Sequence, residues 1–261
     1  MTHDIAVHDW SLDRTLGRFR SDSPDAVAAD SLALVNLPAA LRAHDISVVQ
    51  FCHFHLPRRD PGYLHDLRDA LSESAVRLDT FLVDADNLTH PGTGAADELW
   101  VAAQVRDAVA LGAERVRVIA GKTRTPDAHA SSTAALARLA AQNPEIRVVT
   151  ENWFDVTSTA DDVIRILEPL DDAVGLLIDL GNWTGADKYA ELARITRFAE
   201  TCHAKAHWHG AVMDETDYRR SISTVLEAGY DGPFALVYDG ENDDEWAGLA
   251  AQRSVVESEL A

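Results

Sequence analysis

The chain has 261 residues, 46% of them hydrophobic and 25% charged, which is typical of a globular protein and long enough for a one-domain α/β barrel. Its net charge of −20 disfavours nucleic acid and anionic membranes as partners, and no apolar run reaches the roughly 18 residues that span a bilayer. The two cysteines give no disulfide framework, and the first residues lack the basic and apolar regions of a secretion signal, so we expect a cytoplasmic protein.

Apolar runs of strand length alternate with helical patterns along the whole chain. Strands are predicted at residues 5–10, 46–57, 78–84, 115–121, 147–153, 174–182, 201–210 and 233–240. Helical patterns are found at residues 30–43, 61–71, 95–111, 131–143, 159–167, 189–198, 218–228 and 245–257. A polar link at residues 22–25 separates the first strand from its helix. No change in composition divides the chain, so we expect residues 1–261 to form a single domain.

Several residues with special backbone chemistry set the expected helix boundaries. Pro38 is expected to split the first helix, because proline lacks an amide hydrogen and clashes with the preceding turn. Ser131, Ser132 and Thr159 are expected N-caps, since a side-chain oxygen accepts hydrogen bonds from the free amides of a first turn. Gly112 is expected to end the third helix, because glycine tolerates the left-handed conformation that ends many helices.

The eight repeated strand–helix units predict the fold class. Strands that are continuous apolar runs are typical of a parallel sheet that is buried on both faces. Eight such units with right-handed crossovers favour a closed single-domain (β/α)₈ TIM barrel over an open doubly wound sheet. An open sheet that binds a dinucleotide would carry a G-x-G-x-x-G turn after an early strand, and this chain has none.

Polar residues follow most of the predicted strands, where barrels of this class place their functional side chains. They are His53, His55, Asp84, Asp86, Lys122, Glu151, Asp179, His203, Lys205, His207 and Asp239. Strand ends also meet water, and for Asp86, His53 or His207 taken singly a solvated side chain is the preferred interpretation. The basic cluster Arg115, Arg117, Lys122 and Arg124 is flanked by Glu114 and Asp127, and the surface as a whole is interpreted as acidic and solvated.

Glu151, Asp179 and His203 stand out because each closes an apolar run on one of three successive strands. Two carboxylates and an imidazole make a mixed oxygen and nitrogen site for a divalent cation. If residues 201–210 run extended, Lys205 and His207 share a face with His203, because side chains alternate along a strand. The sequence therefore predicts a metal site with further polar groups beside it.

Two other motifs are incomplete. The G-K-T at residues 121–123 resembles the end of a phosphate-binding P-loop, but Val116 stands where the first glycine belongs. Cys52 and Cys202 lie in apolar runs without a C-x-x-C or H-E-x-x-H pattern, so we expect buried thiols rather than a zinc site or a thiol nucleophile.

Four motifs together resemble the xylose isomerase-like barrels: T-E-N-W with Glu151, I-D-L-G-N-W with Asp179, H-A-K with His203 and Lys205, and the closing G-Y-D-G-P-F-A-L-V-Y-D-G. That superfamily contains sugar phosphate isomerases and epimerases, ketose 3-epimerases, inosose dehydratases and type-IV AP endonucleases. The resemblance covers nearly the whole chain, and F-H-L-P and L-V-D-A-D in the first half are similar to one subgroup of sugar isomerase/epimerase homologues.

The resemblance implies Glu151, Asp179 and His203 as ligands of Mn²⁺, Mg²⁺ or Zn²⁺. A second glutamate usually completes this set, but Val237 stands at its position, with Asp239 two residues further along the same face. The implied activity is a metal-dependent isomerase or epimerase that acts on a small sugar or sugar derivative by abstracting a proton next to a carbonyl. Its implied catalytic residues are Glu151 as base, Lys205 and Asp239; the implied substrate-binding residues are His55, Asp84, Lys122, Asn182 and His207.

Two alternatives stay open at this point. One base and a metal suffice for β-elimination, so a lyase or dehydratase acting on a keto-sugar fits the same residues. A degenerate barrel that binds a sugar without catalysis also fits, because the fourth ligand is missing. A type-IV AP endonuclease would need more His and Asp ligands and a basic DNA-binding face, which the sequence does not offer. A homo-oligomer is expected by analogy only.

Overall fold

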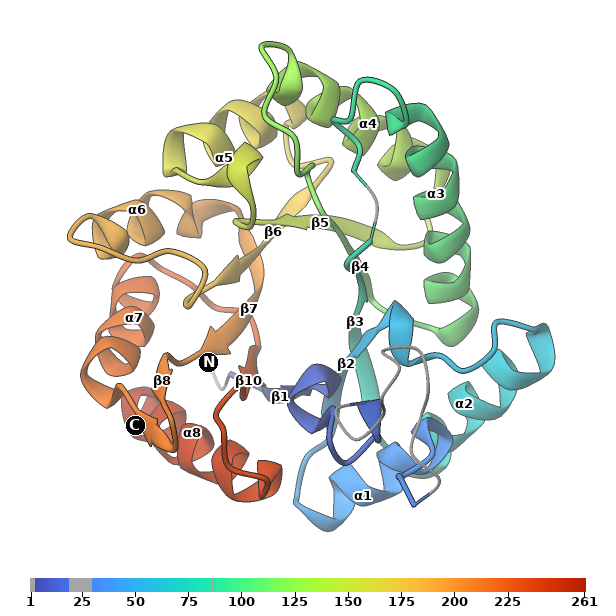
Figure 1. Cartoon of the computed structure of the whole chain (residues 1–261), viewed down its shortest axis with the longest axis vertical. Helices are drawn as coiled ribbons and strands as arrows, with labels where there is room; N and C mark the ends of the chain where they lie inside the picture. The colour runs from blue at the N-terminus through green and yellow to red at the C-terminus, as the bar shows by residue number, and fades with distance from the viewer. Residues whose placement is uncertain (1–2, 19–29, 86) are drawn as a thin grey trace.

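The predicted strands form one closed parallel barrel in the computed structural model, which describes residues 3–18, 30–85 and 87–261 (Figure 1). In the described residues its strands are β1 (Ile5–His8), β2 (Val48–Cys52), β3 (Arg77–Val83), β4 (Arg115–Val118), β5 (Arg147–Glu151), β6 (Gly175–Asp179), β7 (Ala199–Lys205) and β10 (Phe234–Val237). They pair in the order β1-β10-β7-β6-β5-β4-β3-β2, so the first strand closes on the last. The predicted α/β barrel fold is confirmed.

Helices surround the barrel and cover the outer face of its strands (Figure 1). They are α1 (Leu37–Ala43), α2 (Pro61–Glu73), α3 (Gly94–Leu111), α4 (Ala128–Gln142), α5 (Ala160–Leu167), α6 (Lys188–Ile195), α7 (Glu215–Glu227) and α8 (Glu245–Leu260). Leucines at helical spacing make the inner face of α2, where Leu64, Leu67 and Leu71 are all buried. None of the described helices has the length and apolar character needed to cross a membrane.

The helix boundaries follow the capping rules, with two corrections. Thr159 caps α5 and Gly112 ends α3 with a φ of 78°, both as expected. Pro38 does not split a helix but lies in the first turn of α1, where the missing amide hydrogen costs nothing. Ser131 and Ser132 do not cap α4, because that helix already begins at Ala128 and contains them. The expected polar link at residues 22–25 and Asp86 lie outside the described residues.

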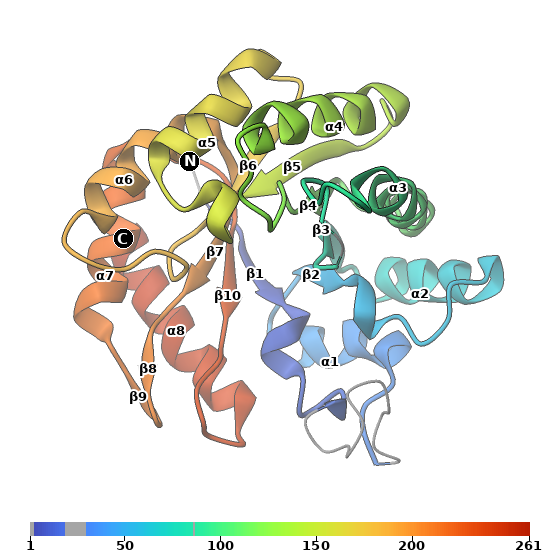
Figure 2. The ribbon, with the colours of Figure 1, turned by 45° about the horizontal axis from the view of Figure 1, so that its top comes forward.

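The predicted strand at residues 201–210 is two elements instead of one. β7 ends at Lys205, and the chain continues into a small hairpin of β8 (Trp208–His209) and β9 (Val212–Met213), which projects from the barrel in Figure 2. Gly210 has a φ of 65° in the turn of this hairpin, a conformation that favours glycine. His207 therefore does not continue the face of β7 that carries His203.

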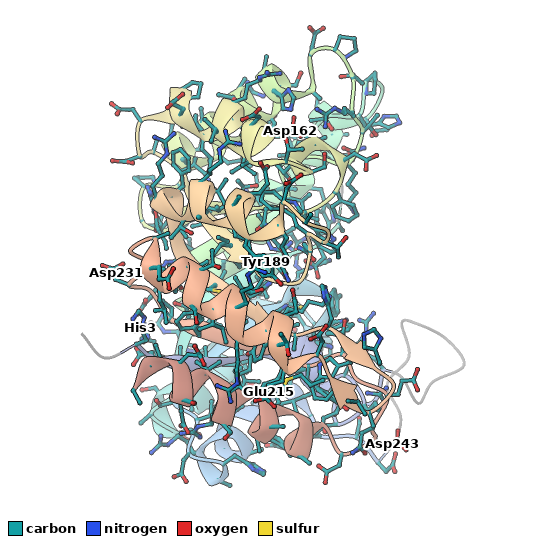
Figure 3. All side chains as sticks on the ribbon, turned by 90° about the vertical axis from the view of Figure 1, so that its left-hand side faces the viewer. His3, Asp162, Tyr189, Glu215, Asp231 and Asp243 are labelled. Carbon is teal, nitrogen blue, oxygen red and sulfur yellow. The ribbon has the colours of Figure 1, made fainter. Side chains whose placement is uncertain are left out.

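Labelled residues in Figure 3 mark the two ends of the barrel. Figure 3 shows the barrel from its side, with His3 and Asp231 (before β1 and β10) at one end and Asp243 (before α8) at the other. Four buried apolar side chains, Cys52, Leu82, Val149 and Leu177, form a small cluster of their own beside the main hydrophobic core. At the carboxyl end of the strands, polar side chains take the place of apolar ones.

Candidate functional site

A cavity of about 160 Å³ opens at the carboxyl ends of the barrel strands. This volume is below the roughly 300–1,000 Å³ of pockets for drug-sized molecules, so the cavity suits a small ligand. It is lined by His8, Trp10, Asp84, Arg117, Glu151, Trp153, Asp179, Asn182, His203, Lys205 and Val237. Of the residues predicted for substrate, catalysis or metal, the lining contains Glu151, Asp179, His203, Lys205, Asp84 and Asn182.

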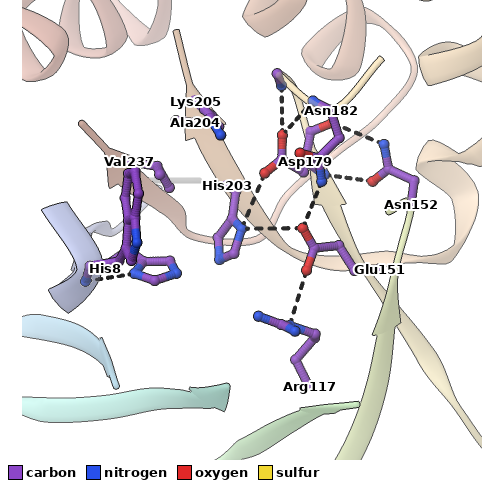
Figure 4. A network of polar contacts seen from close by, with 12 residues as sticks. His8, Arg117, Glu151, Asn152, Asp179, Asn182, His203, Ala204, Lys205 and Val237 are labelled. Carbon is purple, nitrogen blue, oxygen red and sulfur yellow. Dashed lines mark hydrogen bonds and ion pairs between the residues drawn. The ribbon is translucent and has the colours of Figure 1, made fainter. Parts of the chain in front are cut away.

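The three predicted metal ligands converge on one point (Figure 4). His203 lies beside Asp179 in the register of β6 and β7, and its Nδ1 is 3.3 Å from Asp179 Oδ2 and 3.6 Å from Glu151 Oε1. Each residue offers one ligand atom, and these atoms lie within 4.8 Å of one another. All three side chains are buried, with a residue exposure of 3% each. This oxygen and nitrogen donor set fits a divalent cation.

A hydrogen bond on the side of the imidazole away from the carboxylates fixes the orientation of the His203 ring. Its Nε2 lies 2.9 Å from Gln50 Oε1, and the Gln50 amide nitrogen donates to Asp79 Oδ2 at 3.0 Å and to Thr201 Oγ1 at 2.9 Å. Because the Asp79 carboxylate can only accept, Gln50 must turn its oxygen toward His203. The Nε2 of His203 therefore carries a hydrogen, and Nδ1 is left to face the two carboxylates. A fixed outer hydrogen bond of this kind is typical of metal-binding histidines.

Asp179 is held so that one oxygen stays available. Its Oδ1 accepts hydrogen bonds from the amides of Gly181 at 2.6 Å and Asn182 at 2.8 Å, while Oδ2 faces His203. Asn152 also fixes the main chain of Asp179, accepting from its amide and donating to its carbonyl oxygen. Asn182 donates its side-chain amide to Glu151 Oε1 at 2.9 Å and thereby joins the two carboxylates.

Glu151 shares its second oxygen with a buried arginine that the sequence analysis did not assign to the site. Arg117 Nε is 3.0 Å from Glu151 Oε2, and the same guanidinium pairs with Asp84 and donates to the Val83 carbonyl at 3.1 Å. Arg117 is 1% exposed. Burial alone would raise the pKa of Asp84, but the Arg117 guanidinium outweighs it and holds that pKa below its ordinary value.

The pKa shifts of His203 and Asp179 show that the ligand group attracts positive charge. Burial alone would lower the pKa of His203, but the carboxylates of Asp179 and Glu151 outweigh burial and raise it. Burial would likewise raise the pKa of Asp179, but His203 and Lys205 lower it. The two carboxylates thus favour a proton on Nδ1 of His203. A divalent cation held by all three residues would take the place of such a proton.

The opposite wall of the cavity is built from His8, Trp10 and Val237. Val237 is the last residue of β10 and lines the cavity. Asp239 lies beyond the end of β10 and pairs with Lys205, whose Nζ is 3.2 Å from Asp239 Oδ2. Burial alone would lower the pKa of Lys205, but Asp179 and Asp239 raise it, so the ammonium stays charged.

Three predicted substrate contacts have other partners and do not line the cavity. His55 is buried between two carboxylates, with Asp9 Oδ2 2.8 Å from its Nδ1 and Asp13 Oδ1 2.6 Å from its Nε2. Lys122 donates its ammonium to the carbonyl of Asp84 at 3.0 Å. The Nε2 of His207 lies 2.8 Å from the carbonyl oxygen of Gly181, so His207 supports the loop that follows Asp179.

The sequence analysis missed four residues of the lining: His8, Trp10, Arg117 and Trp153. A weak signal existed for two of them, because His8 and Trp10 lie at the end of the first predicted strand, residues 5–10. Arg117 alternates with valines inside a strand, and nothing local indicates whether its side chain points into the barrel or out of it. Its partners, Asp84 and Glu151, are 33 and 34 positions away.

Comparisons with known proteins agree with this fold. The profile of a family described as "Xylose isomerase-like TIM barrel" matches residues 38–255. A xylose isomerase-like TIM barrel protein from Mycobacterium smegmatis, solved in complex with magnesium, is 17% identical with a TM-score of 0.72, over 100% of this chain and 98% of that one. D-allulose 3-epimerase from Methylomonas sp. is 13% identical with a TM-score of 0.72, over 99% and 100%.

A D-tagatose 3-epimerase-like protein is similar at 14% identity with a TM-score of 0.69, over 99% of this chain and 100% of that one. At these identities the structural likeness shows the shared barrel fold. No curated protein sequence matches the chain.

Proposed function

This chain belongs to the xylose isomerase-like TIM barrel family, and on that premise we propose that it is a divalent-metal-dependent isomerase or epimerase of a small sugar. The proposed reaction begins with abstraction of a proton next to a carbonyl. One observation carries the proposal: Glu151 Oε1, Asp179 Oδ2 and His203 Nδ1 face one another, while the hydrogen of the His203 ring is held on the other side by Gln50.

Glu151, Asp179 and His203 would hold the cation, with Mg²⁺, Mn²⁺ and Zn²⁺ as the candidates. When bound, such an ion acts as a Lewis acid on a carbonyl oxygen. The protein supplies the rest: Asn182 and Gly181 fix the two carboxylates, and both carboxylate side chains are buried.

Glu151 is the proposed base. It lies at the end of β5 on the cavity surface, and its Oε2 pairs with Arg117. A proton transferred to Oε2 would turn this ion pair into a contact between a neutral acid and a guanidinium, which is less favourable. Arg117 therefore favours return of the proton to carbon, as an isomerase requires. Lys205, which pairs with Asp239, is the proposed proton donor to a substrate oxygen.

The charges around the cavity favour an uncharged sugar over a sugar phosphate. Among the described residues, the lining contains three carboxylates, Asp84, Glu151 and Asp179, and two side-chain cations, Arg117 and Lys205. A phosphate dianion would add negative charge next to these carboxylates. Both cations are also already paired with carboxylates, so a phosphate would have to displace one of them.

Val237 favours one second candidate, a lyase or dehydratase acting on a keto-sugar. Epimerisation needs proton transfer on both faces of a carbon, and Val237 removes the carboxylate expected on the face opposite Glu151. Elimination needs only one base and an acid for the leaving hydroxyl, for which Lys205 lies close by. The expectation of a homo-oligomer stays a prediction.

Hydrogen exchange at carbon tests the proposal. The protein, loaded with Mg²⁺ or Mn²⁺, is incubated in D₂O with D-allulose, D-tagatose and D-fructose, and the sugars are analysed by NMR. We expect deuterium next to the carbonyl together with an isomeric product. Loss of water from the sugar would identify the lyase instead. If the metal-loaded protein incorporates no deuterium into any of these ketoses, the proposed proton abstraction is wrong for them.

Glu151→Gln should reduce this exchange by about 10²–10⁴-fold, because the amide cannot accept the proton. Glu168→Gln is the matched control, since Glu168 is an exposed residue that pairs with Arg197 on the outer surface. Equal exchange rates in the two variants would remove Glu151 from the mechanism.

A further inference from the structure

We propose that His8 is a hydrogen-bond donor to the sugar, and that its Nε2–H holds a hydroxyl or carbonyl oxygen at the wall of the cavity formed by β1. The identity of the ligand as a sugar rests on the proposed function. The assignment of His8 as a donor, and not as a base or a metal ligand, rests on the contacts of its ring alone.

The position of His8 places it beside the missing carboxylate. β1 and β10 run parallel with Val7 level with Leu236, so the next residues along each strand, His8 and Val237, are neighbours. Both line the cavity, together with Trp10. Figure 4 shows His8 on the side of the cavity across from Glu151, with His203 between them. The strand wall that has lost a carboxylate thus carries an imidazole on the adjacent strand.

A hydrogen bond fixes which nitrogen of His8 carries the hydrogen. The main-chain amide of Trp10 donates to His8 Nδ1 at 3.0 Å, because His8 caps the short 3₁₀-helix Asp9–Leu12. An amide hydrogen can only point at Nδ1 if that nitrogen presents a lone pair. The ring is therefore neutral, and its hydrogen is on Nε2.

The Nε2–H group has no strong acceptor among the described residues. Its hydrogen-bond contact there is Cys52 Sγ at 3.9 Å, and the same sulfur is 3.9 Å from Nδ1. A sulfur equally distant from both nitrogens is not aligned with the Nε2–H bond, and it is a weak acceptor. The donor is thus available to an oxygen that enters the cavity.

The same contacts exclude His8 as a replacement for the fourth metal ligand. A metal ligand must offer a lone pair toward the ion, and His8 has its lone pair on Nδ1, turned to Trp10. Its neighbours Asp9 and Cys52 approach it closely, but both Asp9 oxygens accept from the Cys52 amide, and Oδ2 also pairs with His55. His203, by contrast, has its ring hydrogen turned away from the ligand group.

Nitrogen NMR tests this assignment directly. The protein is labelled with ¹⁵N-histidine and loaded with Mg²⁺, and the His8 signals are identified by their loss in a His8 variant. We expect the neutral form with the hydrogen on Nε2, and a shift of this Nε2 resonance when D-allulose, D-tagatose or D-fructose is added. A hydrogen on Nδ1 overturns the proposal, and so does an Nε2 resonance that none of the three ketoses changes.

A pair of variants separates the donor from the helix cap. Asparagine is a good N-cap, so His8→Asn retains an acceptor for the Trp10 amide but is too short to donate into the cavity. We expect the dissociation constant of the ketose, followed by the fluorescence of Trp10 and Trp153, to rise by roughly 3- to 10-fold, as for one lost hydrogen bond. The affinity for Mg²⁺ should stay at the wild-type value, whereas His203→Asn should lose it.

The outcomes of these experiments are distinct. Unchanged ketose affinity in His8→Asn overturns the proposal, as does a loss of Mg²⁺ affinity like that of His203→Asn. If His8→Asn does not fold, the NMR result on the wild-type protein decides, with His8→Gln used to identify the signal. A ketose that shifts the His8 resonance but exchanges no hydrogen at carbon would contradict the proposed reaction and leave the role of His8 intact.

Discussion

Two buried histidines of this barrel each lie between two carboxylates, and they differ in where the second ring nitrogen points. His55 has one carboxylate on each nitrogen, Asp9 on Nδ1 and Asp13 on Nε2. His203 has both of its carboxylates, Asp179 and Glu151, on Nδ1, and a neutral amide on Nε2. One imidazole and two carboxylates therefore form a closed ion-paired cluster in one place and a converging ligand group in the other.

The distances between the ring nitrogens and the carboxylate oxygens also differ between the two clusters. The carboxylates of Asp9 and Asp13 lie 2.8 and 2.6 Å from the His55 nitrogens, within hydrogen-bond range. Those of Asp179 and Glu151 lie 3.3 and 3.6 Å from the single His203 nitrogen. An imidazolium carries one hydrogen for each member of the first pair. One hydrogen on Nδ1 cannot satisfy both members of the second pair, whereas a cation can.

The largest expected effect comes from breaking the closed cluster. His55→Asn leaves Asp9 and Asp13 buried without their cation, which should cost about 3–5 kcal/mol of unfolding free energy. Chemical denaturation of the metal-free protein measures this loss. The affinity for Mn²⁺, measured by titration calorimetry on the folded variant, should not change. A stable variant with weakened Mn²⁺ binding would place His55 in the metal site and end the distinction.

The second effect is a pH dependence of stability. Burial alone would lower the pKa of His55, but Asp9 and Asp13 raise it from 6.5 to about 9. Since the folded state binds this proton more tightly, its stabilisation is complete below pH 6.5 and is lost as the pH rises to 9. The loss amounts to roughly 3 kcal/mol. The unfolding free energy of the wild type should fall between pH 6 and pH 9. This fall should exceed the corresponding change in His55→Asn by roughly 3 kcal/mol.

Breaking the open cluster should affect the metal. His203→Asn removes one of three ligands and should weaken Mn²⁺ binding by at least about 100-fold, or roughly 2.7 kcal/mol. The free energy of unfolding without metal should fall less than it does in His55→Asn, because Arg117 still pairs with Glu151 and Lys205 still lowers the pKa of Asp179. Titration calorimetry and denaturation of the same samples give both numbers. Wild-type Mn²⁺ affinity in His203→Asn would show that the ion binds elsewhere.

The smallest expected effect concerns the neutral side-chain amide of Gln50. Gln50→Leu keeps approximate size but frees the Nε2 side of His203, so the ring loses its fixed orientation. We expect Mn²⁺ affinity to fall by about 10–100-fold, as for other residues that orient a ligand. Gln252→Leu, a buried glutamine bonded to the carbonyl of Val237 at 2.9 Å, is a matched control for the loss of a buried amide. Equal losses in the two variants would mean a general effect of packing.

The fold and the ligand group follow from short-range signals in the sequence. Each barrel strand is an apolar run, and Glu151, Asp179 and His203 each close one, so the strand direction alone brings them to one end. His55 closes such a run as well and was expected to bind substrate. Its true partners, Asp9 and Asp13, come from the turn after the first strand, which has no pattern that marks it as a partner of residue 55.

The rest of the site depends on contacts between distant segments. Arg117 has the same alternation with valine whether its side chain enters the barrel or leaves it, and only the pairing of β4 with its neighbours decides this. His207 was expected on the face of β7, but the chain leaves that strand at Lys205 to form a hairpin, so His207 contacts the Gly181 loop instead. Asp239 fell outside the cavity for the related reason that β10 ends at Val237.

The chain of contacts from Arg115 through Asp79 and Gln50 to His203 links the two ends of the barrel. Arg115 begins β4, so it lies at the end of the barrel remote from the cavity. An inherited change at Arg115 would alter the field felt by the imidazole without touching the lining of the cavity. Under the proposed function, the choice of ion and the choice of sugar would therefore be free to diverge separately during evolution.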